Sequence, residues 1–232
     1  MTRVMLSSLL ALGVSWAAPQ PRSATHPPAE ATPATIGIAG KWVSVNRSMG
    51  GIGSMWNFKP GGVLTMSPAA IVDSPYKLQG DKLVLPPSTT EPNAKPQIAI
   101  VRFEGDTLVE KPQGEDAGSP EQKMVRTTPP VAGDPPIVGT WKPVMIGPAA
   151  NHEQEAMRAA YLNATYTYTR KGILKLRVPF RVFTGTYNVA AGAFQLKDRP
   201  GSTFHFRMKN GMLYLTRPDG HSEEACVRDD TD

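Results

Sequence analysis

Histidine and cysteine are versatile metal ligands and nucleophiles, and their spacing in this chain predicts neither role. Cys226 is the only thiol, and the histidines stand far apart along the chain. They are His26, His152, His205 and His221. The sequence contains no His-Glu-x-x-His, Gly-x-Ser-x-Gly, Cys-x-x-Cys or phosphate-loop pattern. We therefore expect no enzymatic activity, no metal site and no cofactor.

Basic side chains dominate one stretch of the second half. Residues 163–217 hold ten Lys and Arg against the single acid Asp198, whereas the whole chain has a net charge of +5. If the large apolar side chains of this stretch point inward, strand alternation turns the basic ones outward. The expected face consists of Lys175, Arg177, Lys197, His205, Arg207 and Lys209. Such a face attracts an anionic protein or membrane surface, although a set of separate solvated side chains is the alternative. No nucleic-acid partner is expected, because no recognised binding module is present.

Methionine and aromatic side chains offer a second kind of site, a pocket for a small apolar ligand. A helix expected over 148–162 would lie across one barrel mouth and cover this pocket. The candidate contacts are Met49, Met55, Trp56, Met157, Tyr161, Tyr166 and Tyr187. The alternative is a solid core, because eight short strands enclose little more than side-chain room.

The first 36 residues predict export. Residues 1–17 combine Arg3, an apolar run and a small-x-small cleavage pattern, as secretion signals do. The apolar run is shorter than the ~20 residues that a membrane-spanning helix needs. Residues 18–36 are rich in Pro and Ala and predict a disordered leader. A secreted or periplasmic protein without a transmembrane segment is expected.

The second half repeats the landmarks of the first half in the same order. Gly40-Lys41-Trp42 is answered by Gly139-Thr140-Trp141. The run from Phe58 to Leu64 is answered by the run from Tyr168 to Leu174. A repeat of this length matches two small domains in tandem. We expect domains at 37–128 and 137–232, joined by a Pro-rich linker at 129–136.

Both halves consist of short alternating runs separated by turn residues, which is typical of β-strands. About eight strands are expected in each half, the number at which a small antiparallel sheet can close on itself. The predicted fold class is all-β, with two tandem eight-stranded up-and-down barrels. One short helix is expected at the mouth of the second barrel.

Each repeat has a Gly-x-Trp at its start and an Arg near its end. Together with eight hairpin-linked strands, they resemble the lipocalin-like (calycin-type) barrel. In that family a terminal basic side chain crosses the face of the opening Trp and closes the barrel. The resemblance implies that Trp42 pairs with Arg126 and that Trp141 pairs with Arg228. A guanidinium stacked on an indole contributes ~0.5–2 kcal/mol.

These observations favour a secreted, non-enzymatic binding or accessory protein. It would bind a small apolar ligand or contact a protein through its surface. The alternative is an extrinsic scaffold or inhibitor subunit that docks an anionic partner or membrane through the basic face. A hydrolase or isomerase inside one barrel would need an inward acid or base, and the inferred inward side chains of the second half include none.

Overall fold

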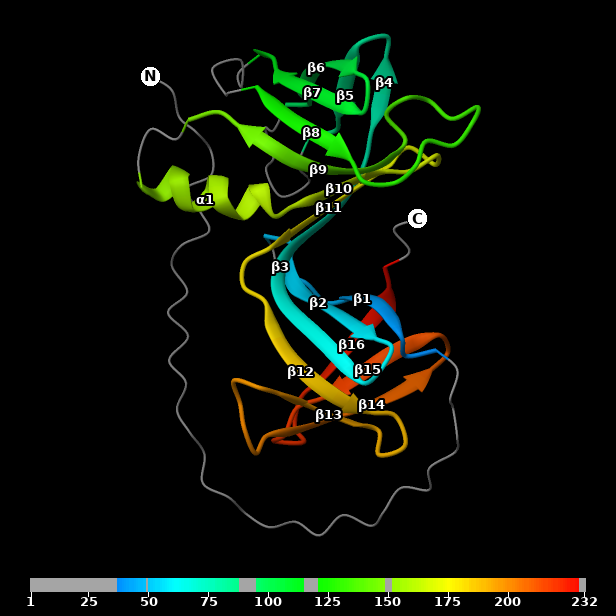
Figure 1. The fold of residues 1–232 in the computed structure, drawn as a ribbon, viewed down its shortest axis with the longest axis vertical. Helices are drawn as coiled ribbons and strands as arrows, with labels where there is room; N and C mark the ends of the chain where they lie inside the picture. Colours follow the sequence, from blue (N-terminus) through cyan, green and yellow to red (C-terminus); the bar gives the residue numbers. More distant parts are fainter. Residues whose placement is uncertain (1–36, 49, 88–94, 115–120, 149–151, 230–232) are drawn as a thin grey trace.

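The computed structural model describes residues 37–48, 50–87, 95–114, 121–148 and 152–229, and these are almost entirely antiparallel strands (Figure 1). The described residues form sixteen strands and one helix. An eight-stranded antiparallel barrel and one short helix confirm the predicted all-β fold class. The predicted signal at 1–17 and leader at 18–36 lie outside the described residues.

The strands of the first half are short except for β3. They are β1 (Gly40–Ser44), β2 (Ile52–Lys59), β3 (Val63–Pro75), β4 (Lys77–Gln79), β5 (Lys82–Leu85), β6 (Gln97–Glu104), β7 (Thr107–Pro112) and β8 (Gln122–Arg126). The second half consists of β9 (Gly139–Ile146), α1 (His152–Leu162), β10 (Thr165–Tyr168), β11 (Ile173–Pro179), β12 (Phe183–Asn188), β13 (Ala193–Leu196), β14 (Thr203–Lys209), β15 (Met212–Thr216) and β16 (Glu223–Arg228).

Each barrel takes its strands from both halves of the sequence. The lower barrel consists of β12 to β16 followed by β1, β2 and β3, and it closes where β12 pairs with β3. The upper barrel consists of β4 to β11. β3 also joins the two ends of this second set of strands. β4 follows β3 directly in the chain, and the end of β3 pairs with β11. Three strands of one repeat therefore complete five strands of the other.

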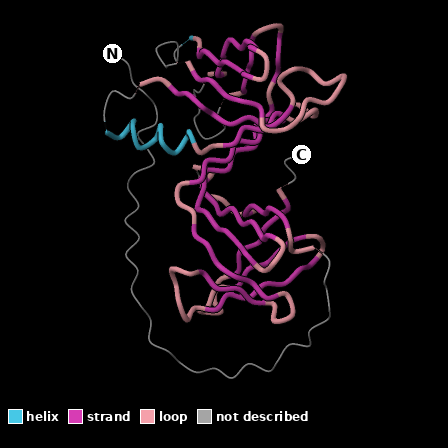
Figure 2. The backbone as a smooth tube through the Cα atoms, viewed as in Figure 1, coloured by secondary structure: helices cyan, strands magenta, loops and turns pink. Residues whose placement is uncertain are grey.

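This exchange of strands between the repeats depends on two long segments, β3 and the nearly continuous stretch of β11 and β12. β3 pairs with β2 in the lower barrel, and from Ala69 to Pro75 it pairs with β11. β11 pairs with β10 in the upper barrel, and the chain then continues into β12, which pairs with β13 in the lower barrel. Figure 2 shows both strands crossing the waist between the two bodies. With thirteen residues, β3 extends roughly 40 Å, which is long enough to serve both barrels.

The expected boundaries at 37–128, 129–136 and 137–232 do not delimit the barrels. The sequence pattern predicted the strands of each repeat correctly. It could not predict which strands pair, because a strand has the same local pattern whether its neighbour comes from its own repeat or from the other one. The pairing is decided by the length of β3 and by its register with β11, and neither is visible in one repeat alone.

The Trp–Arg closure is present in both barrels, but the partners are exchanged relative to the expectation. Arg228 lies over Trp42 with its Cζ 4.6 Å from the ring centroid, and Arg126 lies over Trp141 at 4.2 Å. The predicted pairs Trp42–Arg126 and Trp141–Arg228 were therefore wrong. The exchange of strands is the reason, because β1 pairs with β16 and β8 pairs with β9.

The glycine of each Gly-x-Trp is required by this closure. Gly40 and Gly139 have φ angles of +128° and +138°, a region that favours glycine. A Cβ on Gly40 would lie 2.6 Å from Nη1 of Arg228, and one on Gly139 would lie 2.5 Å from Nη1 of Arg126. Glycine thus leaves room for the guanidinium to reach the indole.

The closure is also anchored by hydrogen bonds to the chain just before each strand. Arg228 donates to the carbonyl of Ala39 at 3.0 Å, and Arg126 donates to that of Val138 at 2.6 Å. The indoles of Trp42 and Trp141 donate to carbonyls four residues earlier, both at 2.8 Å. Each barrel end is therefore held by stacking and by hydrogen bonds together.

Large apolar side chains fill both barrels. The lower core contains buried Trp42, Trp56, Phe58, Leu64, Phe194, Leu196, Phe204, Leu213, Leu215 and Cys226. The upper core contains buried Leu83, Val101, Leu108, Met124, Ile137, Trp141, Tyr166, Tyr168, Leu174 and Val178. Helix α1 packs against β9 and β11 and places Ala160 and Tyr161 on the upper core.

Buried ion pairs hold the waist where the two long strands meet. Arg177 on β11 is 3 % exposed and donates to both carboxylate oxygens of Asp229, at 2.8 and 3.0 Å. Its Nη2 also lies 2.8 Å from Asp73 on β3. Arg47 approaches the same Asp73 carboxylate at 3.1 Å. Burial alone would raise the pKa of Asp73, but the two guanidiniums outweigh it and hold that pKa below its usual value.

Replacing Arg177 with methionine is expected to lower the free energy of unfolding by about 3–5 kcal/mol, because it leaves Asp229 and Asp73 without their shared cation. Urea denaturation at neutral pH measures this change. The matched control is Arg102→Met, which removes exposed ion pairs to Glu104 and Glu121 and is expected to have a much smaller effect, because solvent screens exposed pairs. Equal losses in the two variants would contradict the role of Arg177.

Candidate functional site

A mostly apolar groove lies on the outer face of the lower barrel, beside the waist. Its volume is about 180 Å³, and it opens to solvent. The lining residues are Lys41, Trp42, Val43, Met55, Trp56, Asn57, Thr65, Met66, Ser67, Pro179, Val182 and Asp229. They come from β1, β2, β3, the last residue of β11, the crossover between β11 and β12, and Asp229 after β16.

Strand register builds the floor of this groove. Val43 pairs with Met55, and Met55 pairs with Ser67, so the three side chains form one row across the outer face. The small Ser67 leaves space at the end of the row. Pro179 and Val182 bound that space, because the crossover interrupts the pairing with β3 between β11 and β12.

The equivalent row of the upper barrel is polar. Aligning Leu64 with Leu174 places Arg177 at the position of Ser67 and Thr165 at the position of Met55. Thr165 and Arg177 pair across β10 and β11 as Met55 and Ser67 pair across β2 and β3. The same position in the repeat is therefore filled by a buried guanidinium in one barrel and left as an apolar groove in the other.

The predicted ligand contacts do not gather in one pocket. Met55 and Trp56 line the groove, whereas Tyr187 packs on the lower core. Tyr161 and Tyr166 belong to the upper core. Met49 and the side chain of Met157 lie outside what the structure describes. Alternation along each strand predicted the inward positions well. It could not show that the exchange of strands between the repeats divides these residues between two barrels.

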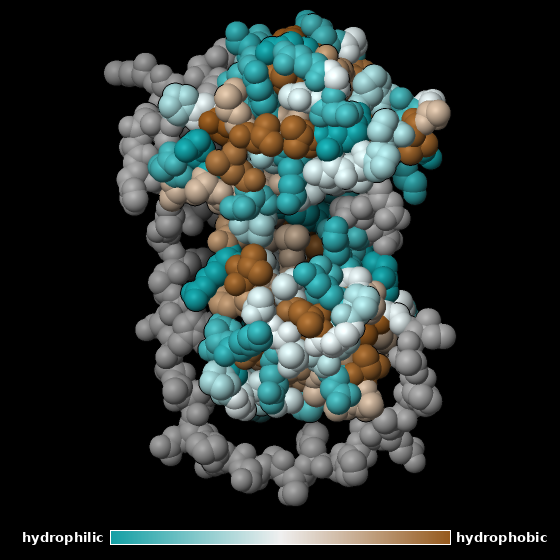
Figure 3. Space-filling view, in the orientation of Figure 1, coloured by the Kyte–Doolittle hydropathy of each residue, from teal (hydrophilic) through white to brown (hydrophobic). Residues whose placement is uncertain are grey.

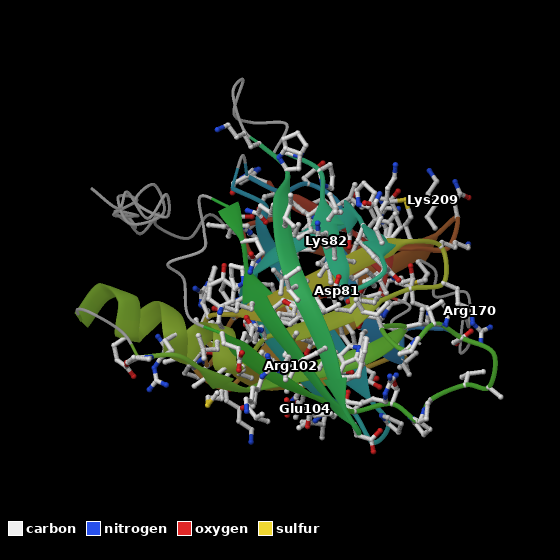
Figure 4. The ribbon with its side chains drawn as sticks, turned by 90° about the horizontal axis from the view of Figure 1, so that it is seen from above. Asp81, Lys82, Arg102, Glu104, Arg170 and Lys209 are labelled. Atoms are coloured by element: carbon white, nitrogen blue, oxygen red, sulfur yellow. The ribbon has the colours of Figure 1, made fainter. Side chains whose placement is uncertain are left out.

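The predicted basic face is also divided. Arg177 is buried at the waist rather than exposed, and Lys175 beside it has its Nζ 4.0 Å from Asp229. Lys197, His205, Arg207 and Lys209 are exposed on or beside β13 and β14 of the lower barrel. Figure 4 shows Lys209 projecting from the edge of the molecule.

Arg207 does not contribute a free charge to that face. It donates to both carboxylate oxygens of Glu223, at 2.7 and 3.1 Å, and lies over the Tyr214 ring at 4.1 Å. Arg177 does point out of its barrel, as expected, but it is not exposed, because the outer faces of β3 and β11 are covered where they meet at the waist.

An inward acid that the sequence reasoning missed lies in the upper barrel. Glu110 on β7 accepts a hydrogen bond from the Tyr168 hydroxyl at 2.5 Å. Burial raises the pKa of Glu110 to about 7, and the Tyr168 hydrogen bond opposes that rise. Strand alternation could have predicted this position. Leu108 points inward, and side chains two residues apart on a strand lie on the same face, so Glu110 points inward too.

Polar groups on neighbouring strands surround Glu110. Gln122 lies opposite Glu110 on β8, and its Nε2 is buried without a hydrogen-bond partner among the described residues. Tyr166 of β10 approaches Gln122, and burial raises the pKa of this tyrosine. Tyr161 of α1 approaches Tyr166 in turn. We call Glu110, Gln122, Tyr161, Tyr166 and Tyr168 the upper polar cluster.

The lower barrel has an inward, partly buried acid, Glu224. Burial raises the pKa of Glu224 on β16, and neighbouring Ser54 and Trp56 offset part of the rise. Glu224 aligns with Gln122 when Arg228 is aligned with Arg126. The two barrels thus keep a polar residue at the same inward position, but only the upper barrel surrounds it with tyrosine hydroxyls.

No protein-family model, curated protein or solved structure matches this chain. In the described part of the chain, no helix has both the length and the apolar character to cross a membrane. On the face seen in Figure 3, apolar residues form small groups on both barrels, separated by polar residues.

Replacing Glu110 with glutamine is expected to remove a pH-dependent contribution to stability. Folding raises the pKa of Glu110 from 4.5 to about 7. Its stabilising contribution is complete below the unfolded value and is lost as the pH rises through the folded value. The variant should therefore be more stable than the parent by about 3 kcal/mol at about pH 8.5, and similar to it at about pH 4.

Urea denaturation at the two pH values measures this difference. Glu104→Gln is the control, because Glu104 is an exposed acid on the adjacent strand β6. A Glu110→Gln effect of the same size at both pH values would disprove the assignment.

Proposed function

We propose that this is an exported, non-enzymatic binding protein that contacts a partner protein through the groove beside Met55. The supporting observation is the outer row Val43–Met55–Ser67, two apolar side chains and a small serine, which stands where the other repeat carries larger polar side chains. Apolar surface that opens to solvent in a groove is the form that many interaction sites take.

The size of the groove favours a side chain over a whole small molecule. Its volume of about 180 Å³ is close to the ~150 Å³ of a cavity that holds benzene. Pockets for drug-sized ligands occupy about 300–1,000 Å³. The occupant that fits is one aromatic or large aliphatic side chain, whose main chain stays outside.

The energy of such a contact is modest. Full burial of one large apolar side chain contributes ~1.5–3 kcal/mol, which is roughly 10- to 150-fold in affinity. The partner must therefore make further contacts around the groove. The exposed Phe180, 49 % accessible on the crossover, and Val182, 61 % accessible at the rim, offer apolar surface for them.

Carriage of an apolar ligand inside a barrel has less support. Both interiors hold large buried side chains, and the aromatic rings of the lower core pack against one another. In this proposal the barrels are a lipocalin-like scaffold that presents surfaces. The exported location follows from the signal-like residues 1–17 and is part of the proposal.

The docking of an anionic partner through the basic face is the weaker alternative. Of its six expected members, Arg177 is buried and Arg207 is paired with Glu223. The remaining exposed members on the lower barrel are Lys197, His205 and Lys209, which leave a smaller positive field than the sequence indicated.

Methionine methyl NMR tests the groove directly. With ¹³C-methyl methionine, addition of N-acetyl-tryptophanamide is expected to shift the Met55 and Met66 signals in a saturable way, because both residues line the groove. Met145 and Met212 are expected to stay unchanged. N-acetyl-alaninamide is the control probe, because its side chain is too small to fill the space.

Matched variants make the test specific. Val182→Asp should abolish the shifts, since it places a charge at the rim of the groove. Val144→Asp, at an exposed valine of β9, should leave them intact. Unmoved Met55 and Met66 signals, or shifts that survive Val182→Asp, would rule out the proposed site.

A further inference from the structure

The upper polar cluster combines an inward, partly buried acid with few hydrogen-bond donors. The Glu110 carboxyl accepts a hydrogen bond from the Tyr168 hydroxyl. A carboxylate has room for about four such bonds, so an ionised Glu110 is poorly satisfied in this position. A protonated Glu110 carries no charge and is well suited to the same apolar surroundings.

No positive charge faces Glu110 from the described elements that pack around it. β10 contributes Tyr166 and Tyr168, β8 contributes the amide of Gln122, and Tyr76 stands edge-on to Tyr168. β5 and β6 contribute apolar side chains to the same core: Leu83, Leu85, Ala99, Val101 and Phe103. Ionisation of Glu110 is therefore compensated only by hydroxyl and amide groups or by entering water.

The cluster is connected to the helix. Tyr161, in the last turn of α1, approaches Tyr166, and Ala160 and Tyr161 both pack on the upper core. The most extensive contacts of α1 are to β9 and β11. A helix that is held to a barrel by side-chain packing is released more easily than a strand of the barrel, whose backbone is hydrogen-bonded on both sides.

We propose that Glu110 is a proton-controlled latch for helix α1. When Glu110 is protonated, the helix stays docked on the upper barrel. When Glu110 ionises, its carboxylate draws water to Gln122 and the tyrosine hydroxyls. The hydrated end of the core then no longer holds Tyr161, and α1 loosens.

The latch predicts a local change in addition to the loss of global stability that ionisation of Glu110 causes. Hydrogen exchange of the α1 amides, corrected for intrinsic rates, is expected to become faster between about pH 6 and pH 8 by at least about tenfold more than that of the reference amides. The amides of β14 and β15 in the lower barrel serve as this internal reference, because they report the global change alone. Glu110→Gln should keep α1 protected at both pH values.

Two further variants separate the latch from a general loss of structure. Tyr168→Phe removes the donor that favours the ionised carboxylate, so the midpoint of the α1 transition should move to higher pH. Glu224→Gln, at the inward acid of the lower barrel, should leave the transition unchanged. If Glu110→Gln fails to fold, the shift caused by Tyr168→Phe still decides the matter.

Exchange of α1 that is independent of pH in the parent protein would overturn the latch. So would a transition that persists in Glu110→Gln, or one that Tyr168→Phe leaves in place. None of these outcomes affects the groove, which lies on the other barrel.

Discussion

The antiparallel pairing of β3 with β11 is the constraint on which the rest of the structure depends. Seven residue pairs, from Ala69–Pro179 to Pro75–Ile173, join the two long strands at the waist. Each strand begins in one barrel and ends in the other, so neither barrel can close without the other repeat. The buried cation of Arg177 lies on this pairing and neutralises acids from β3 and from the end of the chain.

The exchange explains features that two independent barrels would not produce. Trp42 meets Arg228, which lies 186 positions later, and Trp141 meets Arg126, which lies 15 positions earlier. The two repeats also diverge where they meet. One has Arg177 at the waist, and the other has Ser67 at the same position and an apolar groove beside it. The two repeats thus present two different outer faces within one folded unit.

Sequence patterns predicted the strands, the single helix, the closing Trp and Arg residues and most inward positions, because alternation and turn chemistry are local. They did not predict which strands pair, since both repeats carry the same local signals. Arg177 was assigned to the outside of its barrel correctly, yet that outside is buried where two barrels share strands. Glu110 could have been found, because the alternation used elsewhere places it beside Leu108 on the inward face.

Cleavage between the repeats is the most direct test of the exchange. A protease site inserted after Ala132, in an exposed part of the segment that joins β8 to β9, allows the folded protein to be cut into two fragments. Native mass spectrometry and size-exclusion chromatography should then find one stable 1:1 complex that separates only in denaturant, because each barrel needs both fragments. Two fragments that separate without denaturant and remain folded would show that each repeat forms its own barrel, and would contradict the account.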